Sequence, residues 1–513
     1  MEIKILVIAE CFIFAALSAH ATFSSHWLLE TDSSELAGSH FFRQTIEAEF
    51  ASAAQAAEAT FSFRELPPGM EMSISARGDD TDSRHFANVQ ALDAAGAKGT
   101  FYLNALNKDF VEKTIREILD RGSSVGGHTS SHPSLPKLNA NAIFEEILGN
   151  RIAIETAANT CVNAFTLPFC QWRSAENPSV SHAIGEALRR AGYLGGGDIL
   201  VDPAASYGLP YGSFVGTLQF SYDDRNPSPE LFEKGIGKAE KRFLEGDFPP
   251  CGPHVTMGMH SWAKAEGMKN VTRAFMTRTR NPDAPFAGRI WFCSENEFIA
   301  AWMQKNHSRV LATEMNGAKV RWTILRPDSA GLGANVPLSV QIAPPPNALR
   351  ADGVEVGVSA LGQTEIPAPY GIPVLVYHVA MADTAGELVP TAKFPRLAAH
   401  LDIDLAVGIA TLVLRNDGDE SMRELRLVMR VPLAFDADVR CEPGSSLPAS
   451  LAPGASCALR MALKFVHHTP WYCDGAALFD GELDFLLGDK PCRLHVTRRM
   501  PLNEPSRRIS NDL

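Results

Sequence analysis

The sequence lacks a basic run, and its 47 lysines and arginines are outnumbered by 59 aspartates and glutamates among 513 residues. Proteins that bind nucleic acid usually present a basic face, so this composition argues against a nucleic-acid partner. No two of the nine cysteines have Cys-x-x-Cys spacing, which argues against a zinc ribbon. There is also no short-period repeat of the solenoid kind. Beyond the N-terminus no stretch is apolar enough to suggest a membrane span.

The N-terminus carries the longest apolar stretch. Residues 5–19 are mostly apolar, although Glu10 interrupts them, and Ala19-His20-Ala21 fits the small-residue pattern of a cleavage site. We therefore expect residues 1–21 to be a signal peptide and the mature protein to be secreted or periplasmic; a buried N-terminal strand or helix is the alternative. Eight cysteines follow this segment, and an even number in an exported protein permits disulfides without revealing their pairing.

The pattern of apolar residues divides the rest of the chain. Residues 22–69 read as a leader, with a helix expected over 39–60, and residues 70–308 alternate short strands with helices. Expected strands cover 72–76, 99–104 and 123–126, and expected helices cover 83–95, 108–121, 139–158 and 182–191. Such alternation predicts an α/β domain with a parallel sheet, open or closed into a barrel. In a barrel, chemistry lies at the C-terminal ends of the strands.

After residue 308 the pattern changes to short strands with frequent turns. Val320, Trp322 and Ile324 alternate with polar residues, as in a strand with one buried face. We expect one all-β, sandwich-like domain over 309–500 and a C-terminal tail over 501–513.

Three groups of chemistry-bearing residues follow expected strands. Asp79 and Asp80 follow the strand over 72–76, His128 and His132 follow the strand over 123–126, and His260 ends an apolar strand. Alone, each has an ordinary explanation: a solvated acidic pair, structural histidines, or a satisfied strand-end histidine. Two histidines four apart would lie on one side of a single helical turn, spaced to hold one metal ion.

The order of these groups resembles the polysaccharide deacetylases, the family 4 carbohydrate esterases with a NodB-homology domain. Gly78-Asp79-Asp80-Thr81 resembles the first motif of the family, and His128-Thr129-Ser130-Ser131-His132 matches its second motif in full. The segment 165–170 resembles the third motif, and His260 resembles the histidine of the last motif. The resemblance covers about residues 70–305 and implies a deformed (β/α) barrel.

The resemblance also implies a role for each residue. Asp80, His128 and His132 would bind a divalent metal ion, with zinc expected. Asp79 would be the general base and His260 the general acid in removing acetyl groups from an N-acetylated carbohydrate polymer or oligomer, such as chitin or peptidoglycan. The backbone N–H of Phe169 would hold the oxyanion, and Trp262 would line the sugar site or belong to the core.

Four departures from the family pattern keep other functions open. Thr81 and Cys170 stand where the family usually has glycine, and Thr166 stands where many members carry an arginine that orients the catalytic aspartate. No clear Asp-Trp motif is present, and Asp198 and Asp202 are candidates by position only. One alternative is therefore a glycan-binding protein with impaired catalysis on the same fold. Another is a hydrolase that acts on O-acetyl esters or on cyclic amides.

Overall fold

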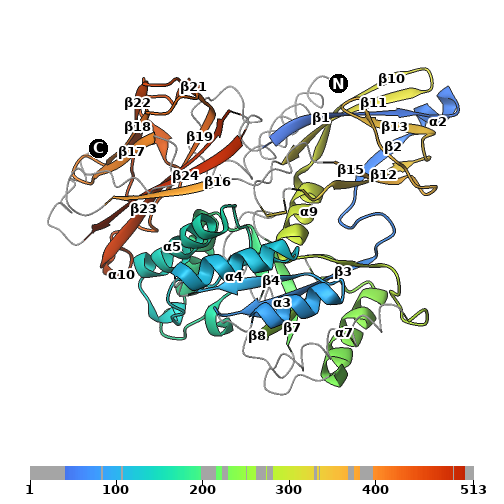
Figure 1. Ribbon diagram of the computed structural model, residues 1–513, viewed down its shortest axis with the longest axis horizontal. Coiled ribbons are helices and arrows are strands. Elements are labelled where there is room, and N and C mark those ends of the chain that lie inside the picture. Colours follow the sequence, from blue (N-terminus) through green and yellow to red (C-terminus); the bar gives the residue numbers. More distant parts are fainter. Residues whose placement is uncertain are drawn as a thin grey trace, which may run out of the picture.

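The computed structural model places three units side by side (Figure 1). It describes residues 41–81, 85–104, 108–197, 215–221, 229–249, 251–260, 273, 281–327, 332–333, 335–367, 375–381, 397–488 and 490–502. The expected signal peptide, Asp198, Asp202 and Trp262 lie outside these residues. Within them, no helix is long and apolar enough to cross a membrane.

The central unit is built on a parallel sheet in the strand order β5-β4-β3-β8-β7-β6, with β9 also pairing with β3. The strands are β3 (Met72–Asp79), β4 (Gly99–Leu103), β5 (Ser124–Gly127), β6 (Gly195–Gly197), β7 (Val215–Ser221), β8 (His254–His260) and β9 (Ile290–Phe292). The predicted α/β domain with a parallel sheet is therefore confirmed. In β3 every residue is buried, as expected for a strand covered on both faces.

Backbone hydrogen bonds also link β5 and β6, the two edge strands of this sheet, through the segment around Ala164. The N–H of Gly127 donates to the carbonyl of Ala164 at 2.9 Å, and the N–H of Phe165 donates to the carbonyl of Gly195 at 2.9 Å. Parallel bridges pair Gly127 with Phe165 and Ala164 with Gly195. The segment around Ala164 thus lies between β5 and β6, as a closed barrel requires; the barrel itself stays a prediction.

Four helices lie where the sequence predicts them: α3 (His85–Ala94), α4 (Lys108–Asp120), α5 (Ala140–Ala158) and α6 (Val180–Ala191). The described residues also form α7 (Pro229–Leu244) and α9 (Glu295–His307), which the sequence analysis did not predict. The Asn139 side chain caps α5 by accepting from the N–H of Ala142, and Ser294 and Glu297 form a capping box on α9. Figure 1 shows α3, α4 and α5 side by side over the sheet, where they bury one continuous apolar core.

The second unit contradicts the expected helix over 39–60. This segment forms β1 (Phe41–Glu49), the short helix α2 (Ala53–Ala57) and β2 (Thr60–Phe63). Alternate side chains of β1 are buried, including Ile46 and Ala48, which pack with Trp322 and Ile324. Buried and solvent-facing side chains thus alternate along β1, as they do in a strand with one buried face. The composition of the segment, which favours a helix, had concealed this alternation.

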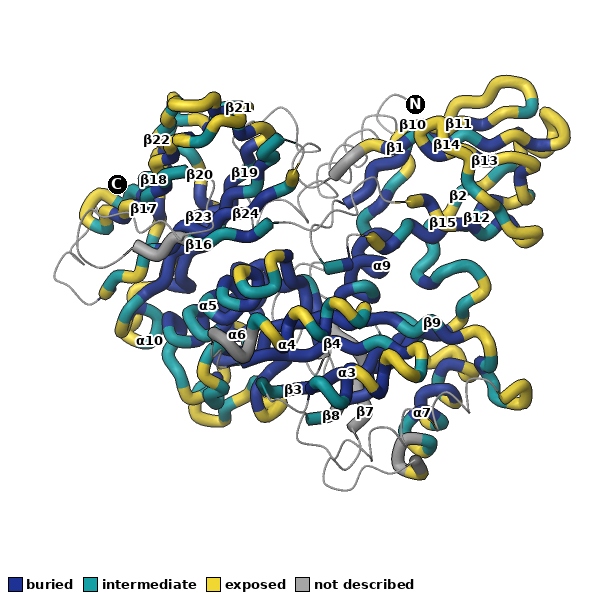
Figure 2. Tube along the Cα trace, in the orientation of Figure 1, coloured by how far each residue is buried: buried dark blue, intermediate teal, exposed yellow. Residues whose placement is uncertain are grey.

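Strands from distant parts of the chain complete this second unit. They are β10 (Arg309–Asn316), β11 (Lys319–Pro327), β12 (Leu338–Ala343), β13 (Ala348–Ala351), β14 (Val354–Glu355) and β15 (Gln363–Ile366). Together with β1 and β2 they form a five-stranded and a three-stranded sheet around one small core. In Figure 1 the blue β1 accordingly lies among yellow strands, and Figure 2 shows that their outer ends are exposed.

The third unit is a β-sandwich near the C-terminus. Its strands are β16 (Leu375–Met381), β17 (Leu397–Asp404), β18 (Ile409–Asn416), β19 (Met422–Arg430), β20 (Arg440–Cys441), β21 (Ser450–Leu451), β22 (Ser456–Ala462), β23 (Ala476–Leu487) and β24 (Lys490–Pro501), with a short helix α10 (Pro470–Cys473). They form a five-stranded and a four-stranded sheet around one core. The strands expected in one domain over 309–500 therefore belong to two separate units, each with its own core.

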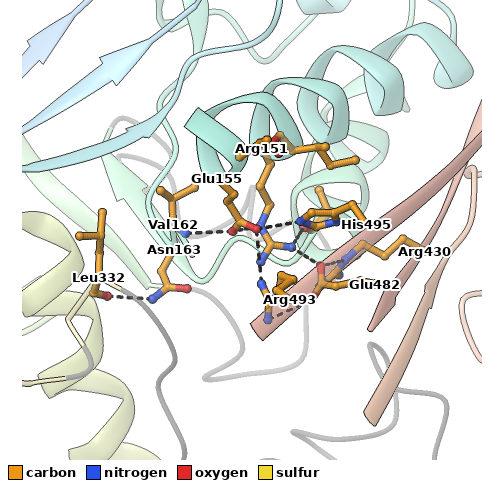
Figure 3. A network of polar contacts seen from close by, with 12 residues as sticks. Arg151, Glu155, Val162, Asn163, Leu332, Arg430, Glu482, Arg493 and His495 are labelled. Atoms are coloured by element: carbon orange, nitrogen blue, oxygen red, sulfur yellow. Dashed lines mark hydrogen bonds and ion pairs between the residues drawn. The ribbon is translucent and has the colours of Figure 1, made fainter. Parts of the chain in front are cut away.

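A buried ionic network joins the sandwich to α5 (Figure 3). The guanidinium of Arg151 on α5 contacts the carboxylates of Glu155 at 2.9 Å and of Glu482 on β23 at 3.0 Å. The imidazole of His495 on β24 contacts Glu155 at 3.0 Å, and Arg493 contacts Glu482 at 3.1 Å. All five side chains are at least nine-tenths buried. Charged groups are buried at such a boundary only when paired, so the sandwich and α5 have a fixed relative position.

The eight cysteines of the described residues all have free thiols. The disulfides that an exported protein permits are therefore not present in this structure.

Candidate metal centre and its surroundings

The site is built at the C-terminal end of β3, where Asp79 is the last residue of the strand. Arg77 lies two residues earlier, so both side chains project from the same face. The Nε of Arg77 donates to Oδ1 of Asp79 at 2.7 Å, and a second guanidinium N–H donates to Oδ2. Burial by itself would raise the pKa of the Asp79 carboxyl, but the charge and hydrogen bonds of Arg77 outweigh it and lower the pKa. Asp79 is therefore an ionised carboxylate at neutral pH.

Asp80 follows in the left-handed region at φ 68°, which directs its side chain away from the path of β3. Its carboxylate accepts a hydrogen bond from the Asn104 amide at 3.3 Å, and its carbonyl is bonded to the imidazole of His85. The hydroxyl of Thr81 donates to the carbonyl of Asn104 at 2.5 Å, and the Thr81 N–H donates to the Asn104 side chain at 3.2 Å. Thr81, where the family usually has glycine, thus fastens the turn to the end of β4.

The two histidines lie on a loop, and the helical turn expected for His-x3-His is wrong. Thr129 and His132 adopt left-handed φ values of 66° and 57°, which no α-helix contains. Contacts with Glu146 on α5 determine the path of the loop: its side chain accepts from the N–H of Ser131 at 2.8 Å and from the Ser131 hydroxyl at 2.7 Å. Loop geometry of this kind brings the imidazoles together, with ring centroids 4.9 Å apart.

Backbone groups hold His128 in one orientation. Its Nδ1 lies 2.9 Å from the carbonyl oxygen of Thr166, which can only accept a hydrogen bond, so Nδ1 carries the proton. The lone pair of Nε2 can therefore bind a metal ion. Its N–H is shared between the carbonyl of Leu103 at 3.1 Å and the side-chain oxygen of Asn150 at 2.9 Å. Four segments thus position one imidazole: β4, β5, α5 and the segment around Thr166.

The donor atoms of Asp80, His128 and His132 converge on one point. Oδ1 of Asp80 lies 3.2 Å from Nε2 of His132 and 3.6 Å from Nε2 of His128. Two ligands of a tetrahedral zinc ion with bonds near 2.1 Å are about 3.4 Å apart, so both distances from Asp80 suit a divalent ion. All three donor atoms lie within 4.8 Å of one another. Burial and the neighbouring His128 lower the pKa of His132, which favours the neutral imidazole that a metal requires.

The β5 glycines Gly126 and Gly127 belong to the strand and allow close packing, although a glycine pair after a strand is typical of a sharp turn. Both lie inside the strand, and a Cβ on Gly127 would be 2.0 Å from the Tyr193 hydroxyl and 2.9 Å from Oδ1 of Asn150. Gly78 likewise lies inside β3, where a Cβ would be 2.7 Å from the ring of Phe101.

The remaining predicted residues divide into three cases. His260 ends β8 and is the direct register partner of Asp79 in the parallel pair, so the structure brings the expected base and acid to one strand end. Phe169 lies in a short 3-10 turn at φ 59°, its side chain is 58% exposed, and its ring packs edge-on against His132 with centroids 4.5 Å apart. Trp262 lies outside the described residues.

Sequence reasoning missed Arg77, His85, Asn104 and Asn150. Arg77 left a readable signal, because an arginine inside a strand that must be buried needs a partner, and Asp79 stands on the same face. The other three act through the fold: each touches a ligand or its backbone from a segment 5 to 24 residues away in sequence.

A second cluster of acids with a histidine does not resemble a metal site chemically. Asp480, Glu482 and His495 offer ligand atoms close together, and all three are buried. Arg430 lies 2.6 Å from Glu482, and Arg493 lies 3.1 Å from it. Burial would lower the pKa of His495, but Asp480 and Glu155 raise it to about 9, so this imidazole carries a proton. A cation would meet positive charges already in place.

A comparison with protein families matches the segment that contains the candidate metal ligands. The polysaccharide deacetylase family model matches residues 78–188, which include Asp79, Asp80 and both loop histidines. No curated protein matches the chain.

Several solved structures are similar at low identity. The CE4 domain of a multidomain xylanase from the hindgut metagenome of Trinervitermes trinervoides is 14% identical, with a TM-score of 0.31 over 44% of this chain and 89% of that one. A family 4 carbohydrate esterase from Streptomyces lividans is 14% identical, with a TM-score of 0.30 over 41% and 90%. The chitin deacetylase of Colletotrichum lindemuthianum is 15% identical, with a TM-score of 0.30 over 45% and 88%. On the family match and the motifs that it spans, the chain carries a NodB-homology domain of the polysaccharide deacetylase family.

Proposed function

We propose that this protein is a metal-dependent hydrolase that removes acetyl groups from an N-acetylated polysaccharide or oligosaccharide of the chitin or peptidoglycan kind. The observation that carries the proposal is the convergence of one carboxylate oxygen and two imidazole nitrogens. The carboxylate oxygen of Asp80 lies 3.2 Å from Nε2 of His132 and 3.6 Å from Nε2 of His128. The carbonyl of Thr166 fixes the tautomer of His128. This two-histidine, one-carboxylate set leaves positions open for water and substrate.

A divalent ion in this set, with zinc expected, would supply an activated water and a positive charge for the acyl oxygen. Asp79, ionised beside Arg77, accepts the proton of the water. His260, across from Asp79 on β8, donates a proton to the leaving amine. The backbone N–H of Phe169 donates to the negative charge that develops on the acyl oxygen. The exposed Phe169 side chain lies beside His132, where a sugar ring would enter.

The proposal includes export of the protein after removal of residues 1–21, because polymers of this kind lie outside the cytoplasm. Cleavage after Ala21 is checked by sequencing the N-terminus of the protein recovered from the medium or periplasm. Retention of residues 1–21 in the recovered protein would contradict this part of the proposal.

The function is tested by measuring acetate release from fragments of chitin, peptidoglycan and acetylated xylan, with ring opening of a cyclic amide measured in parallel. We expect acetate from at least one N-acetylated fragment, and a loss of about 10²-fold or more in Asp79→Asn and His260→Ala. Asp417→Asn is the matched control, because Asp417 is an exposed carboxylate in the sandwich and pairs with Arg415 at 2.7 Å.

Other results would support the alternatives. Glycan binding that is unchanged in His260→Ala, without acetate from any substrate, identifies a binding protein on a deacetylase fold. Acetate from xylan alone identifies an O-acetyl esterase. Ring opening of the added cyclic amide, without acetate from any fragment, identifies a hydrolase of cyclic amides.

A further inference from the structure

Arg77 is a buried arginine committed to the carboxylate of Asp79. Its side chain is 1% exposed, and it holds both oxygens of Asp79 through two guanidinium N–H groups, one of them at 2.7 Å. A bidentate arginine–carboxylate pair fixes the plane of the carboxylate as well as its charge. A lysine at this position would supply the charge without the fork.

A tyrosine ring and a buried carboxyl group lie near Arg77. The guanidinium of Arg77 lies over the ring of Tyr102 on β4, 5.7 Å from the ring centroid. The hydroxyls of Tyr102 and Thr256 both donate to the carboxyl group of Glu295, which is fully buried. Burial raises the pKa of Glu295 to about 8, so at neutral pH its carboxyl group is largely protonated. The carboxylate that Arg77 holds is that of Asp79.

We propose that Arg77 is the positioning residue of the general base. It holds the Asp79 carboxylate in one orientation at the end of β3, facing the strand-end position of His260 and beside the ligand Asp80. Thr166 stands at the position where many relatives carry an arginine. Its backbone carbonyl is hydrogen-bonded to Nδ1 of His128. The proposal rests on the proposed deacetylase function, and it predicts that the shape of the Arg77 side chain is needed as well as its charge.

The test compares Arg77→Lys with wild type in the full-length protein, by acetate release, zinc content and thermal unfolding. Arg326→Lys is the matched control, because Arg326 is also 1% exposed but lies in β11, where it bonds to Gln44. We expect Arg77→Lys to lower kcat by about 10²-fold with KM and zinc content close to those of wild type, since a misplaced catalytic group affects the reaction step. Arg326→Lys keeps the wild-type kcat.

The combination with Asp79→Asn separates positioning from a merely structural role. If Arg77 acts through Asp79, Arg77→Lys has no further effect on the residual kcat of Asp79→Asn, measured with excess enzyme. An equal loss in both backgrounds would overturn the proposal, and so would a kcat for Arg77→Lys within two-fold of wild type. A zinc-loaded wild-type protein without activity on any fragment would instead refute the proposed function, and the role of Arg77 with it.

Discussion

The side-chain oxygen of Asn150, in the middle of α5, accepts a hydrogen bond of 2.9 Å from the backbone N–H of the metal-ligand candidate His128. The amide of Asn150 also donates to the carbonyl of Leu103 at 3.1 Å, at the end of β4. The same helix carries Glu146, which fixes the loop between the histidines, and Glu155, which contacts the sandwich. Helix α5 therefore connects the candidate metal centre with the C-terminal unit.

Asn150→Ala is expected to weaken zinc binding by about 10- to 100-fold, because residues behind a metal ligand determine its orientation. The loss of two buried hydrogen bonds is also expected to lower the free energy of unfolding by about 1–3 kcal/mol. Zinc titration and urea unfolding measure the two effects. Asn416→Ala is the control, since buried Asn416 bonds the carbonyls of Glu420 and Leu451 in the sandwich at 2.8 and 2.9 Å. An equal loss of zinc affinity in both variants would contradict the prediction.

Gly127→Ala is expected to lower the free energy of unfolding by about 1–3 kcal/mol, because the new methyl group would lie 2.0 Å from the Tyr193 hydroxyl. Tyr193→Phe removes that oxygen and should recover part of the loss in the double variant. Gly357→Ala is the control: Gly357 is exposed, and nothing lies within 4 Å of a Cβ built there. Urea unfolding of wild type, Gly127→Ala, the double variant and Gly357→Ala measures these effects. A Gly127→Ala variant as stable as Gly357→Ala would show that the strand tolerates a side chain.

Stability should fall with rising pH because of His495. Burial disfavours its charged form, but Asp480 and Glu155 raise its pKa from 6.5 to about 9 in the folded protein. The stabilisation is therefore complete below about pH 6.5 and is lost as the pH rises through 9, and amounts to about 3 kcal/mol at most. Arg151 and Arg493 both contact Glu155, at 2.9 and 3.5 Å. His378, with its pKa lowered to about 4 mainly by burial, stays neutral throughout.

Urea unfolding of wild type and His495→Gln between pH 6 and 10 measures this dependence. The variant should be less stable at pH 6 and should lose less stability toward pH 10. Parallel curves for the two proteins would assign the pH dependence to other groups.

Local patterns predicted the central unit well. The strands and helices between Met72 and Ala191 follow the expected alternation, because each combines an apolar period with a nearby end signal. The Asp79–Asp80 pair and the His-x3-His spacing identified the candidate ligands, and the fold brings them together.

Long-range pairing could not be predicted in the same way. Strand β1 looked helical because of its composition, and nothing local reveals that β11 is its partner or that Ile46 lies opposite Trp322. The division of the β region into two units depends on this pairing. The role of Arg77 was not predicted, because its pairing with Asp79 follows only once β3 is known to be buried on both faces.

We propose that Asp80, His128 and His132 together hold one divalent ion. Titration of zinc into chelator-treated protein, followed by calorimetry, tests it most directly in wild type, Asp80→Asn and the control Asp480→Asn. We expect one zinc per chain in wild type and in the control, and an affinity weaker by about 100-fold or more in Asp80→Asn. Equal zinc binding by all three proteins, or none by wild type, would contradict it.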